Sequence, residues 1–370
     1  MRIAVNARFL IENKLEGIGW YSFEVLKRIV ENHPEDQFLF LFDRPYSTQF
    51  IFGKNVEARI VNPPARHPLL WYLWFEWSLP RIIEEWKADV FFSPDGYGSL
   101  SLNLPQYIVV HDLAYIHYPK QIPWMVYRFY KWFVPKYIHK AEHIFSVSNA
   151  TKKDIMNQFG IHDEKISIAY NGCKEIFKPI DSERKQELRD AYSSGKAYFL
   201  FVGALHPRKN VKHLILGFDQ FKIESNSDKK LLIVGRKAWH TFEIEDAYQH
   251  SKHKSDIHFL EYLNSDELSK ITAAAFCAVC PSFLEGFGVP ALEALNCDIP
   301  LIVSDRFSLP EVGGDAAIKI NPDKPSSISA AMMSMEQSQD LNSLIIAGRN
   351  HRIKFNWDDT ARHIYSVMNA

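Results

Sequence analysis

Residues 275–293 read Ala-Phe-Cys-Ala-Val-Cys-Pro-Ser-Phe-Leu-Glu-Gly-Phe-Gly-Val-Pro-Ala-Leu-Glu. The apolar run Cys277–Pro281 is short and unbroken, which is typical of a parallel strand covered on both faces. Gly286 and Gly288 then allow a sharp turn, and Pro290 fits the first turn of a helix, where its missing N–H costs nothing. The stretch therefore predicts a buried strand that turns directly into a helix, the repeating unit of an α/β fold.

The same pattern of short apolar runs, separated by stretches of helical length, recurs along the whole chain. In the first half the expected strands are Arg2–Asn6, Phe38–Phe42, Val90–Phe92, Tyr107–Val110, His143–Val147 and Ile166–Ala169. In the second half they are Tyr198–Val202, Leu231–Val234, Ile257–Leu260, Cys277–Pro281, Pro300–Val303 and Ala317–Ile320. The pattern predicts two Rossmann-like units in series.

The chain has 370 residues, enough for two well-buried cores. A proline and a charged, apolar-poor stretch follow Lys178, and the next strand begins after Gly195. We expect one domain over residues 1–178 and a second over residues 195–356. A last helix, about 357–370, follows a Phe-Asn-Trp break, and the pattern alone assigns it to neither domain.

Composition excludes several classes of protein. Lys and Arg total 43 and Asp and Glu total 44, a net charge of −1, so no global field recruits nucleic acid. No apolar run reaches about 18 residues, and the apolar part of the first strand is too short for a signal peptide. Cys277 and Cys280 lie in an apolar run with no second pair, and we interpret them as buried strand thiols rather than metal or redox ligands. We expect a cytoplasmic protein.

The Gly-rich turn quoted above also has the features of an anion site. The backbone N–H groups of Phe287, Gly288 and Val289 would lie at the positive end of the following helix. Glu285 and Glu293 flank the turn and are suited to accept hydrogen bonds from hydroxyl groups. A nucleotide-sugar, with phosphates in the middle and polyols at both ends, fits this arrangement. The alternative is an ordinary turn with two solvated glutamates.

A second cluster follows the expected strand Tyr198–Val202. Residues 203–210 read Gly-Ala-Leu-His-Pro-Arg-Lys-Asn, and a helix is expected from Val211 to Phe221. Arg208 and Lys209 stand at a helix start, where the dipole disfavours cations, so a bound anion explains them better than helix stability does. A planar guanidinium and an ammonium suit a diphosphate. The alternative is a solvated surface pair.

Two features of the first half are weaker signals. Gly17-Ile-Gly19 makes a short turn after the first strand, at the crossover where α/β sheets bind ligands, but it lacks the full dinucleotide fingerprint. His111 and Asp112 follow the strand Tyr107–Val110. His111 is therefore either a polar contact to a substrate or part of a structural turn.

Aromatic residues make up 14% of the chain and concentrate in Trp71–Trp77 and Trp124–Phe133. The basic residues near these segments are Arg66, Arg81, Arg128, Lys131 and Lys136. Such stripes usually pack in a core or between domains. The alternative is a lipid-facing or sugar-stacking surface, because Trp and Tyr suit membrane interfaces and basic residues attract anionic lipid.

The order of these segments resembles the family 4 retaining glycosyltransferases of the GT-B fold. The segments are Gly-Ile-Gly, His-Asp-Leu, Ser-Val-Ser-Asn, Tyr-Asn-Gly, Val-Gly-Ala-Leu-His-Pro-Arg-Lys-Asn, the Glu285–Glu293 stretch and Leu-Pro-Glu-Val-Gly-Gly-Asp-Ala-Ala. The resemblance runs from Met1 to about Ala361, and the two glutamates are its most specific motif. The Pro-Arg-Lys-Asn and His-Asp-Leu forms are most similar to bacterial mannosyltransferases of O-antigen or exopolysaccharide synthesis.

The resemblance implies an α/β protein of two Rossmann-like domains whose parallel sheets face each other across a cleft, with the last helix packed back on the first domain. It implies a nucleotide-sugar donor, GDP-mannose by preference, on the second domain and a saccharide or lipid-linked saccharide acceptor on the first. It also implies no metal and no further cofactor. If the aromatic helices meet lipid, the cytoplasmic enzyme would be peripheral on the inner face of the membrane.

The resemblance also implies a role for each site residue. Arg208 and Lys209 would hold the diphosphate, Glu293 would bind the ribose hydroxyls, and Glu285 would hold the transferred sugar. His111 would contact that sugar near the reacting carbon. The remaining donor-binding residues would be Gly17, Gly19, Gly203, Gly286, Phe287, Gly288 and Val289.

Two positions depart from the family pattern. Ala204 stands where many relatives carry Arg, and Asp298 where they usually carry Gly. Neither changes the two glutamates or the Arg-Lys pair, so we expect an active enzyme. The alternatives are another two-Rossmann sugar enzyme, such as a phosphorylase or a nucleotide-sugar epimerase, and a catalytically silent sugar-nucleotide-binding module.

Overall fold

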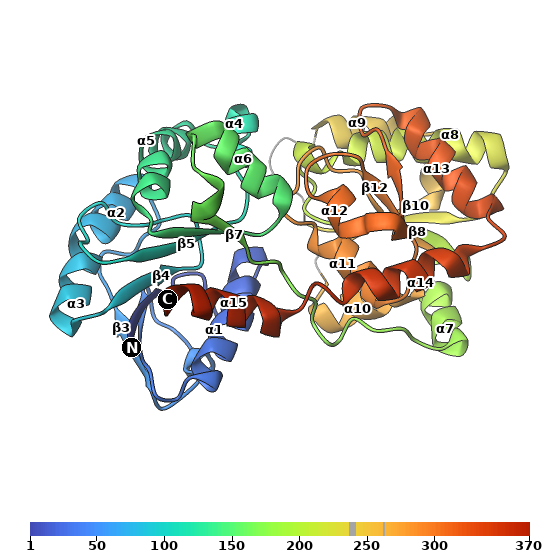
Figure 1. The fold of residues 1–370 in the computed structure, drawn as a ribbon. Coiled ribbons are helices and arrows are strands. Elements are labelled where there is room, and N and C mark those ends of the chain that lie inside the picture. Colours follow the sequence, from blue (N-terminus) through green and yellow to red (C-terminus); the bar gives the residue numbers. More distant parts are fainter. Residues whose placement is uncertain (237–241, 262) are drawn as a thin grey trace. The chain divides into compact units, whose positions relative to one another are not determined.

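The computed structural model describes residues 1–236, 242–261 and 263–370, and the contacts between them divide the chain into two compact units. Unit 1 comprises Met1–Asn171 and Asn356–Ala370, and unit 2 comprises Gly172–Phe355. The first boundary thus lies before Lys178, where the sequence pattern placed it. Each unit has a parallel sheet with helices on both faces (Figure 1).

Unit 1 is built on a parallel sheet of seven strands among the described residues, in the order β3-β2-β1-β4-β5-β6-β7. The strands are β1 (Arg2–Asn6), β2 (Gln37–Phe42), β3 (Val56–Ile60), β4 (Val90–Ser93), β5 (Gln106–Val110), β6 (His143–Ser146) and β7 (Ile166–Ile168). The helices are α1 (Gly17–Asn32), α2 (Pro68–Leu73), α3 (Leu79–Trp86), α4 (Ala114–His117), α5 (Trp124–Lys140), α6 (Asn149–Phe159) and α15 (Trp357–Met368). Shorter turns are η1 (Thr48–Phe50), the π-helical η2 (Trp74–Ser78), η3 (Pro119–Gln121) and η4 (Asp163–Lys165). The strand order reverses between β1 and β4, the kind of place where open α/β sheets bind ligands.

β3 is a strand that the sequence pattern did not predict. It lies at the edge of the sheet, with Val56 opposite Phe38 of β2. Its sequence Val-Glu-Ala-Arg-Ile carries two charged residues, which an edge strand can expose to water. A search for unbroken apolar runs therefore passes over it.

A buried ion pair joins the loops after β1 and β4. Arg8 and Asp95 are 6% and 1% exposed, and Arg8 Nε donates to Asp95 Oδ2 at 2.9 Å. Asp95 Oδ1 accepts further hydrogen bonds from Ser93 Oγ, Asn6 Nδ2 and the backbone N–H of Tyr97. The guanidinium also lies 4.1 Å from the centre of the Tyr97 ring. Both buried charges are therefore paired, and the two loops are held together.

The last helix, α15, belongs to unit 1 and packs beside α1 (Figure 1). The Trp357 ring meets the Tyr21 ring edge to face, with the ring centres 5.6 Å apart. Tyr365 Oη donates to Asp36 Oδ2 at 2.7 Å. The helix therefore packs on residues far from it in the sequence and not on the residues that precede it.

Unit 2 is built on a parallel sheet that, in the part of the chain described, has six strands in the order β10-β9-β8-β11-β12-β13. The strands are β8 (Tyr198–Val202), β9 (Lys230–Val234), β10 (Ile257–Leu260), β11 (Cys277–Cys280), β12 (Leu301–Ser304) and β13 (Ala317–Ile320). The helices are α7 (Ser182–Ser193), α8 (Val211–Ser225), α9 (Phe242–His250), α10 (Ser265–Ala274), α11 (Val289–Asn296), α12 (Leu309–Gly313), α13 (Pro325–Gln337) and α14 (Leu341–Arg352). Shorter turns are η5 (Pro207–Lys209), η6 (Lys254–Asp256) and η7 (Gly314–Ala316). The order reverses between β8 and β11, and all twelve strands expected from the sequence are present, with each end within about one residue of its expected place.

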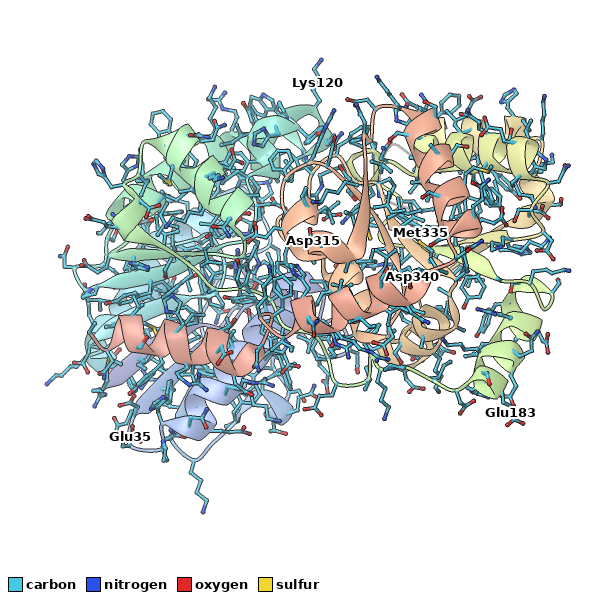
Figure 2. The ribbon with its side chains drawn as sticks, turned by 45° about the vertical axis from the view of Figure 1, so that its right-hand side comes forward. Glu35, Lys120, Glu183, Asp315, Met335 and Asp340 are labelled. Carbon is cyan, nitrogen blue, oxygen red and sulfur yellow. The ribbon has the colours of Figure 1, made fainter. Side chains whose placement is uncertain are left out.

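Helix α7 lies in the stretch that the sequence pattern left between the two domains. Leu188 is buried on one face of the helix, and Arg189 Nε donates to the carbonyl oxygen of Ala274 on α10 at 3.1 Å. The other face is charged, and Glu183 projects into solvent (Figure 2). A helix that buries so few apolar residues has the composition of a linker, which is why the pattern did not assign it.

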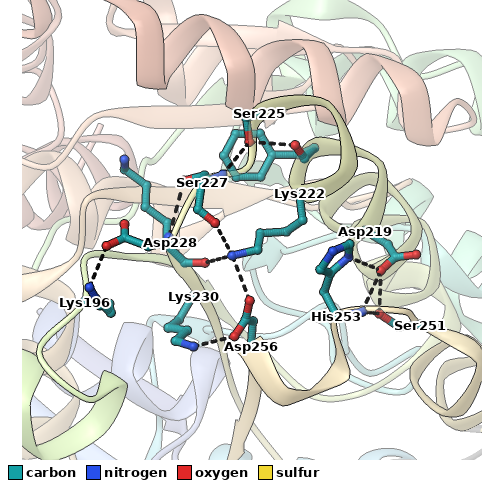
Figure 3. A network of polar contacts seen from close by, with 12 residues as sticks. Lys196, Asp219, Lys222, Ser225, Ser227, Asp228, Lys230, Ser251, His253 and Asp256 are labelled. Atoms are coloured by element: carbon teal, nitrogen blue, oxygen red, sulfur yellow. Dashed lines mark hydrogen bonds and ion pairs between the residues drawn. The ribbon is translucent and has the colours of Figure 1, made fainter.

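A polar network closes unit 2 at the amino ends of β9 and β10 (Figure 3). Lys222 of α8 is 6% exposed and pairs with Asp256 Oδ2 at 2.7 Å, and Lys230 pairs with the same carboxylate. Burial acts to raise the pKa of Asp256, but the hydrogen bonds and charges of the two lysines lower it below the ordinary value. Close by, Asp219 Oδ1 lies 2.8 Å from His253 Nδ1. The network lies at the end of the sheet opposite the carboxyl ends of the strands, so we interpret it as structural.

The buried pair of unit 1 leads to a prediction about stability. Asp95→Ala leaves the Arg8 guanidinium buried without its carboxylate, and we expect the free energy of unfolding to fall by about 3–5 kcal/mol. Arg59→Ala, which removes an exposed pair with Glu57, is the control and should cost less than about 1 kcal/mol. Urea denaturation followed by circular dichroism measures both. Equal losses in the two variants would contradict the role given to the buried pair.

Candidate functional site

Two loops meet where the strand order of unit 2 reverses, and the first follows β8. It runs from Gly203 through the turn η5 to Asn210, whose φ of 61° lies in the left-handed region that Asn tolerates. Asn210 is 3% exposed, and its Nδ2 donates to the carbonyl oxygens of Pro281 at 3.0 Å and Pro322 at 2.7 Å. This one side chain ties the loop after β8 to the loops after β11 and β13.

The second loop, residues 281–288, follows β11 and leads into α11. Gly288 ends it with a φ of 99°, and a Cβ there would lie 2.7 Å from the side chain of Leu309, so the position requires glycine. Pro290 occupies the first turn of α11, as predicted, and the N-cap residue is Gly288, which has no side chain to cap the helix. The amino end of α11, which begins at Val289, is a place where the helix dipole favours an anionic or acceptor group.

Ser308 holds the backbone of this loop by hydrogen bonds. Its Oγ lies 2.8 Å from the carbonyl oxygens of both Glu285 and Phe287, so the hydroxyl donates to this pair of acceptors. The Phe287 ring packs edge to face against Phe355, with the ring centres 5.3 Å apart. Gly286 lies between these two anchored residues and is itself buried. The backbone of the turn is thus fixed before any ligand arrives.

The two predicted clusters form one site. Lys209 Nζ donates to Glu285 Oε1 at 2.6 Å, and the two side chains are 18% and 12% exposed. Ser282 Oγ donates to the same oxygen at 2.7 Å. Burial acts to raise the pKa of Glu285, but the charges of Lys209 and Arg208 lower it below the ordinary value. Glu285 is therefore an ionised carboxylate beside two cations.

Arg208 joins the same two loops through its backbone and its side chain. Its carbonyl oxygen accepts from the Phe283 N–H at 2.9 Å, and its Nη1 donates to the carbonyl oxygen of Leu284 at 3.4 Å. The guanidinium is thereby held at the loop that carries Glu285.

The structure corrects one step of the sequence reasoning. Lys209 was assigned to a bound anion because a helix start disfavours a cation, yet Glu285 neutralises it there. The position of Lys209 therefore does not by itself require a ligand. The alternative of two solvated glutamates is also wrong, because Glu285 and Glu293 are 12% and 8% exposed.

Glu293 lies on α11 and is buried. Burial raises its pKa to about 8, although the charge of Lys174 acts to lower it. Its neighbours Cys173 and Cys297 are thiols whose own pKa values are raised by burial first and by the Glu293 carboxyl second. At neutral pH Glu293 is therefore mostly protonated, and its carboxyl group can both donate and accept hydrogen bonds.

The remaining predicted residues lie in unit 1. Gly17 and Gly19 form the first turn of α1, and a Cβ on Gly19 would lie 2.8 Å from a carbonyl oxygen of the loop after β1. His111 follows β5, and its Nε2 lies 2.9 Å from the carbonyl oxygen of Pro94. Because a carbonyl only accepts, Nε2 carries the proton and Nδ1 is an acceptor. Burial lowers the pKa of His111, so the ring is neutral at pH 7.

Four residues that hold the unit 2 site were not predicted. Ser282 and Asn210 stand inside the quoted motifs, so their types and places were a usable signal. Ser308 and Gly235 follow other strands and carry no such signal. A Cβ on Gly235 would lie 1.9 Å from the carbonyl oxygen of Gly203, so the two loops approach at a distance that only glycine allows.

A group of side chains that could bind a metal ion lies in unit 1, outside the unit 2 site. Among the residues described, His33, Glu35 and Asp36 are close enough together to hold a metal ion. Asp36 already pairs with the amino terminus at 2.5 Å and with Tyr365. Cys277 and Cys280 are free and buried in β11, and burial raises the pKa of Cys280 to about 12. The interpretation of the cysteines as buried strand thiols is confirmed.

Comparisons with known proteins agree with this geometry. The family model described as Glycosyltransferase Family 4 matches residues 19–174, and the model described as Glycosyl transferases group 1 matches residues 183–351. O-antigen chain mannosyltransferase B of Escherichia coli is 25% identical over 363 residues, which cover 94% of each chain. O-antigen chain mannosyltransferase RfbU of Salmonella typhimurium is 27% identical over 305 residues, covering 82% of this chain and 80% of the relative.

Solved structures share the fold at lower identity. Sucrose-phosphate synthase from Thermosynechococcus elongatus aligns with a TM-score of 0.78 at 14% identity, over 100% of this chain and 98% of the other. Anabaena HepE in complex with UDP-glucose aligns with a TM-score of 0.73 at 15% identity, over 100% and 99%. With two parallel-sheet units and family models matched in both, this chain is a family 4 glycosyltransferase of the GT-B fold, similar to bacterial mannosyltransferases.

Proposed function

We propose that this glycosyltransferase transfers a hexose, mannose by preference, from a nucleotide-sugar to a saccharide or lipid-linked saccharide, with retention of configuration. GDP-mannose is the favoured donor, the reaction needs no metal or further cofactor, and the enzyme works in the cytoplasm. Two relatives that cover most of the chain are named O-antigen chain mannosyltransferases, which supports the sugar and the acceptor class. The HepE complex with UDP-glucose supports a nucleotide-sugar donor.

The observation that carries the proposal is the cluster of Arg208, Lys209 and Glu285 beside the amino end of α11. An ammonium has three N–H donors, and the contact with Glu285 uses one of them. In our proposal the donor diphosphate lies between these cations and the amino end of α11. The hard step is to break the anomeric C–O bond while a nucleoside diphosphate leaves. Fixed positive charge aimed at the leaving group lowers that barrier without a metal ion.

The two glutamates are suited to different hydroxyl groups. Glu285 is ionised and held by Lys209 and Ser282, so it would accept hydrogen bonds from the transferred sugar. Glu293 is buried and mostly protonated, so it would both donate to and accept from the ribose hydroxyls. Neither glutamate is assigned as a nucleophile, and we propose attack on the same face as the leaving phosphate.

In unit 1 we keep the roles that the family resemblance implies. Gly17 and Gly19 would line the diphosphate, and at Gly17 no atom lies within 4 Å of the place that a Cβ would take. His111 would contact the transferred sugar near the reacting carbon. Its neutral ring, with the proton on Nε2 and an acceptor at Nδ1, suits a sugar hydroxyl as donor.

The first prediction concerns the cations. Arg208→Ala and Lys209→Ala should each lower the rate of sugar transfer by about 10²- to 10³-fold, because each removes positive charge from the leaving group. The control is Lys212, which lies at the start of α8, just after Lys209, and pairs with exposed Glu243 of α9. Lys212→Ala should leave the rate unchanged. Radiolabelled transfer to a lipid extract or an oligosaccharide measures all three.

Loss of folding must be separated from loss of charge in this test. Lys209→Ala leaves Glu285 without its cation, so its thermal unfolding is measured beside that of the double variant Lys209→Ala/Glu285→Gln. A double variant that is as stable as the wild type yet inactive supports the proposal. Full activity in Arg208→Ala and in the double variant would contradict it.

The second prediction concerns pH. Because the pKa of Glu293 is raised from its ordinary value near 4.5 to about 8, stability from its neutral carboxyl is full below pH 4.5 and is lost as pH rises toward 8. Glu293→Gln cannot ionise, so relative to the wild type it should gain up to about 4 kcal/mol in free energy of unfolding between pH 5 and pH 8.5. Urea titrations at both pH values measure the difference. If the free energies of unfolding of the wild type and Glu293→Gln changed equally with pH, the raised pKa of Glu293 would be contradicted.

The third prediction concerns the donor. GDP should raise the melting temperature by several degrees, and UDP and ADP by less, because a ligand that binds only the folded state stabilises it in proportion to its occupancy. EDTA should change neither the shift nor the transfer rate. A larger shift in melting temperature with UDP than with GDP would indicate a UDP-sugar donor in place of GDP-mannose. No shift with any nucleotide or nucleotide-sugar would contradict the proposed donor class.

The alternative functions that the sequence left open would give different experimental results. A phosphorylase would need pyridoxal phosphate on a lysine and would absorb in the near ultraviolet. An epimerase would interconvert the nucleotide-sugar without an acceptor. A silent binding module would show the thermal shift with no turnover.

A further inference from the structure

The two aromatic segments of unit 1 are part core and part surface. Trp74 and Phe75 are fully buried, and Phe129 is 6% exposed, so core packing is the correct interpretation for these three. Trp71 stacks on Tyr130, with the ring planes 9° from parallel. α2 and α5 therefore lie side by side.

The outward side chains of α2, η2 and α5 are also apolar. Trp77, Trp124 and Trp132 are 68%, 67% and 62% exposed. The other exposed apolar side chains on these elements are Leu69, Tyr72, Leu73 and Met125. We call these seven residues the α2–α5 face. Three exposed Trp side chains, one on η2 and two on α5, are unusual for a surface that meets only water.

The charge on α5 has one sign. Its basic residues are Arg128, Lys131, Lys136 and Lys140, all exposed, and residues 124–140 contain no Asp or Glu. Lys120, just before α5, also projects from the surface (Figure 2). On η2, Glu76 is 7% exposed and accepts the backbone N–H groups of Leu100 and Ser101. The exposed carboxylates nearby belong to the neighbouring segments, Glu84 and Glu85 on α3 and Glu142 after α5, so none on α2, η2 or α5 offsets the basic side chains of α5.

The cations and the Trp rings are in contact. The Arg128 guanidinium lies 4.9 Å from the centre of the Trp124 ring, and Lys136 Nζ lies 4.3 Å from that of Trp132. Each pair places a positive charge against the face of an amphipathic ring on α5. That combination matches the boundary between lipid headgroups and acyl chains, where Trp is favoured and anionic headgroups attract Lys and Arg.

We propose that the α2–α5 face docks on the anionic headgroup surface of a lipid bilayer. The Trp side chains enter the interface, and the basic residues lie against the headgroups. A second copy of the chain would bring the four basic residues of α5 against the same four, so charge repulsion disfavours that occupant. Among the residues described, no helix is long and apolar enough to cross a bilayer, so the contact is peripheral. This inference rests on the proposed function and extends it. A lipid-linked acceptor lies in the bilayer, and docking would bring the enzyme to that acceptor.

The test is sedimentation with vesicles and does not depend on catalysis. We expect the wild type to bind vesicles of phosphatidylglycerol and phosphatidylcholine at low salt, to bind phosphatidylcholine alone at least tenfold more weakly, and to dissociate at high salt. Trp124→Ala/Trp132→Ala and Arg128→Glu/Lys136→Glu should each lower the partition coefficient at least tenfold, since one basic residue is worth about fivefold.

Matched variants control for exposure and for net charge. Phe242→Ala/Ile346→Ala removes exposed apolar side chains of unit 2, and Lys54→Glu/Lys178→Glu makes the same charge change elsewhere. Both should bind as the wild type does. Quenching of wild-type Trp fluorescence by brominated lipid, reduced in Trp124→Phe/Trp132→Phe, reports insertion even if an alanine variant is unstable.

Three results would overturn the proposal. The first is a wild type that does not bind anionic vesicles, and the second is an equal loss in the patch and control variants. The third is a concentration-dependent dimer that the Trp variant abolishes, which would assign the face to a second copy. None of these results bears on the donor site of unit 2, which the nucleotide panel tests separately.

Discussion

Each of the two sheets reverses its strand order once, and the two loops that form the unit 2 site meet at that reversal. On either side of such a point the crossovers leave toward opposite faces, so the loops at the carboxyl ends diverge and leave room for a ligand. In unit 2 the reversal between β8 and β11 brings Lys209 to Glu285, 76 residues away in the sequence. In unit 1 the reversal between β1 and β4 carries the buried Arg8–Asp95 pair. Each unit therefore has an ion pair in the loops at the point where its strand order reverses.

The unit 2 site combines charges that partly cancel. Glu285 neutralises one cation, which leaves a second cation and the amino end of the α11 dipole as the net positive contribution. A carboxylate beside a phosphate site would repel the phosphate if it were unpaired. In the proposed binding mode, Glu285 is held by Lys209 and Ser282 and accepts from hydroxyl groups, while the cations bind the phosphates. Sugar and phosphate would then be recognised side by side in one pair of loops.

Much of this fold was readable from the sequence, because parallel strands covered on both faces appear as unbroken apolar runs. Such a search passes over β3, an edge strand with exposed charges, and α7, a helix that buries few apolar residues. The motifs identified Arg208, Lys209, Glu285 and Glu293. They could not give the ion pair of Lys209 with Glu285, since that contact depends on which strands are neighbours.

The raised pKa of Glu293 could not be predicted either, because it depends on burial in the folded unit and on the charge of Lys174, far away in the sequence. The aromatic segments show the same limit. Their composition predicted helices with large side chains, but it could not divide buried Trp74 from exposed Trp77, because the π-helical turn η2 changes which residues face the sheet. Local pattern predicts elements, whereas their pairing in space determines which side chains meet.

The central claim is that the two loops after β8 and β11 hold a diphosphate between cations and the end of α11. A crystal structure of the protein with GDP-mannose or GDP tests it most directly. We expect the diphosphate against Arg208, Lys209 and the first turn of α11, with the ribose hydroxyls at Glu293. A nucleotide bound elsewhere, with these two loops unoccupied at saturating ligand, would contradict the claim.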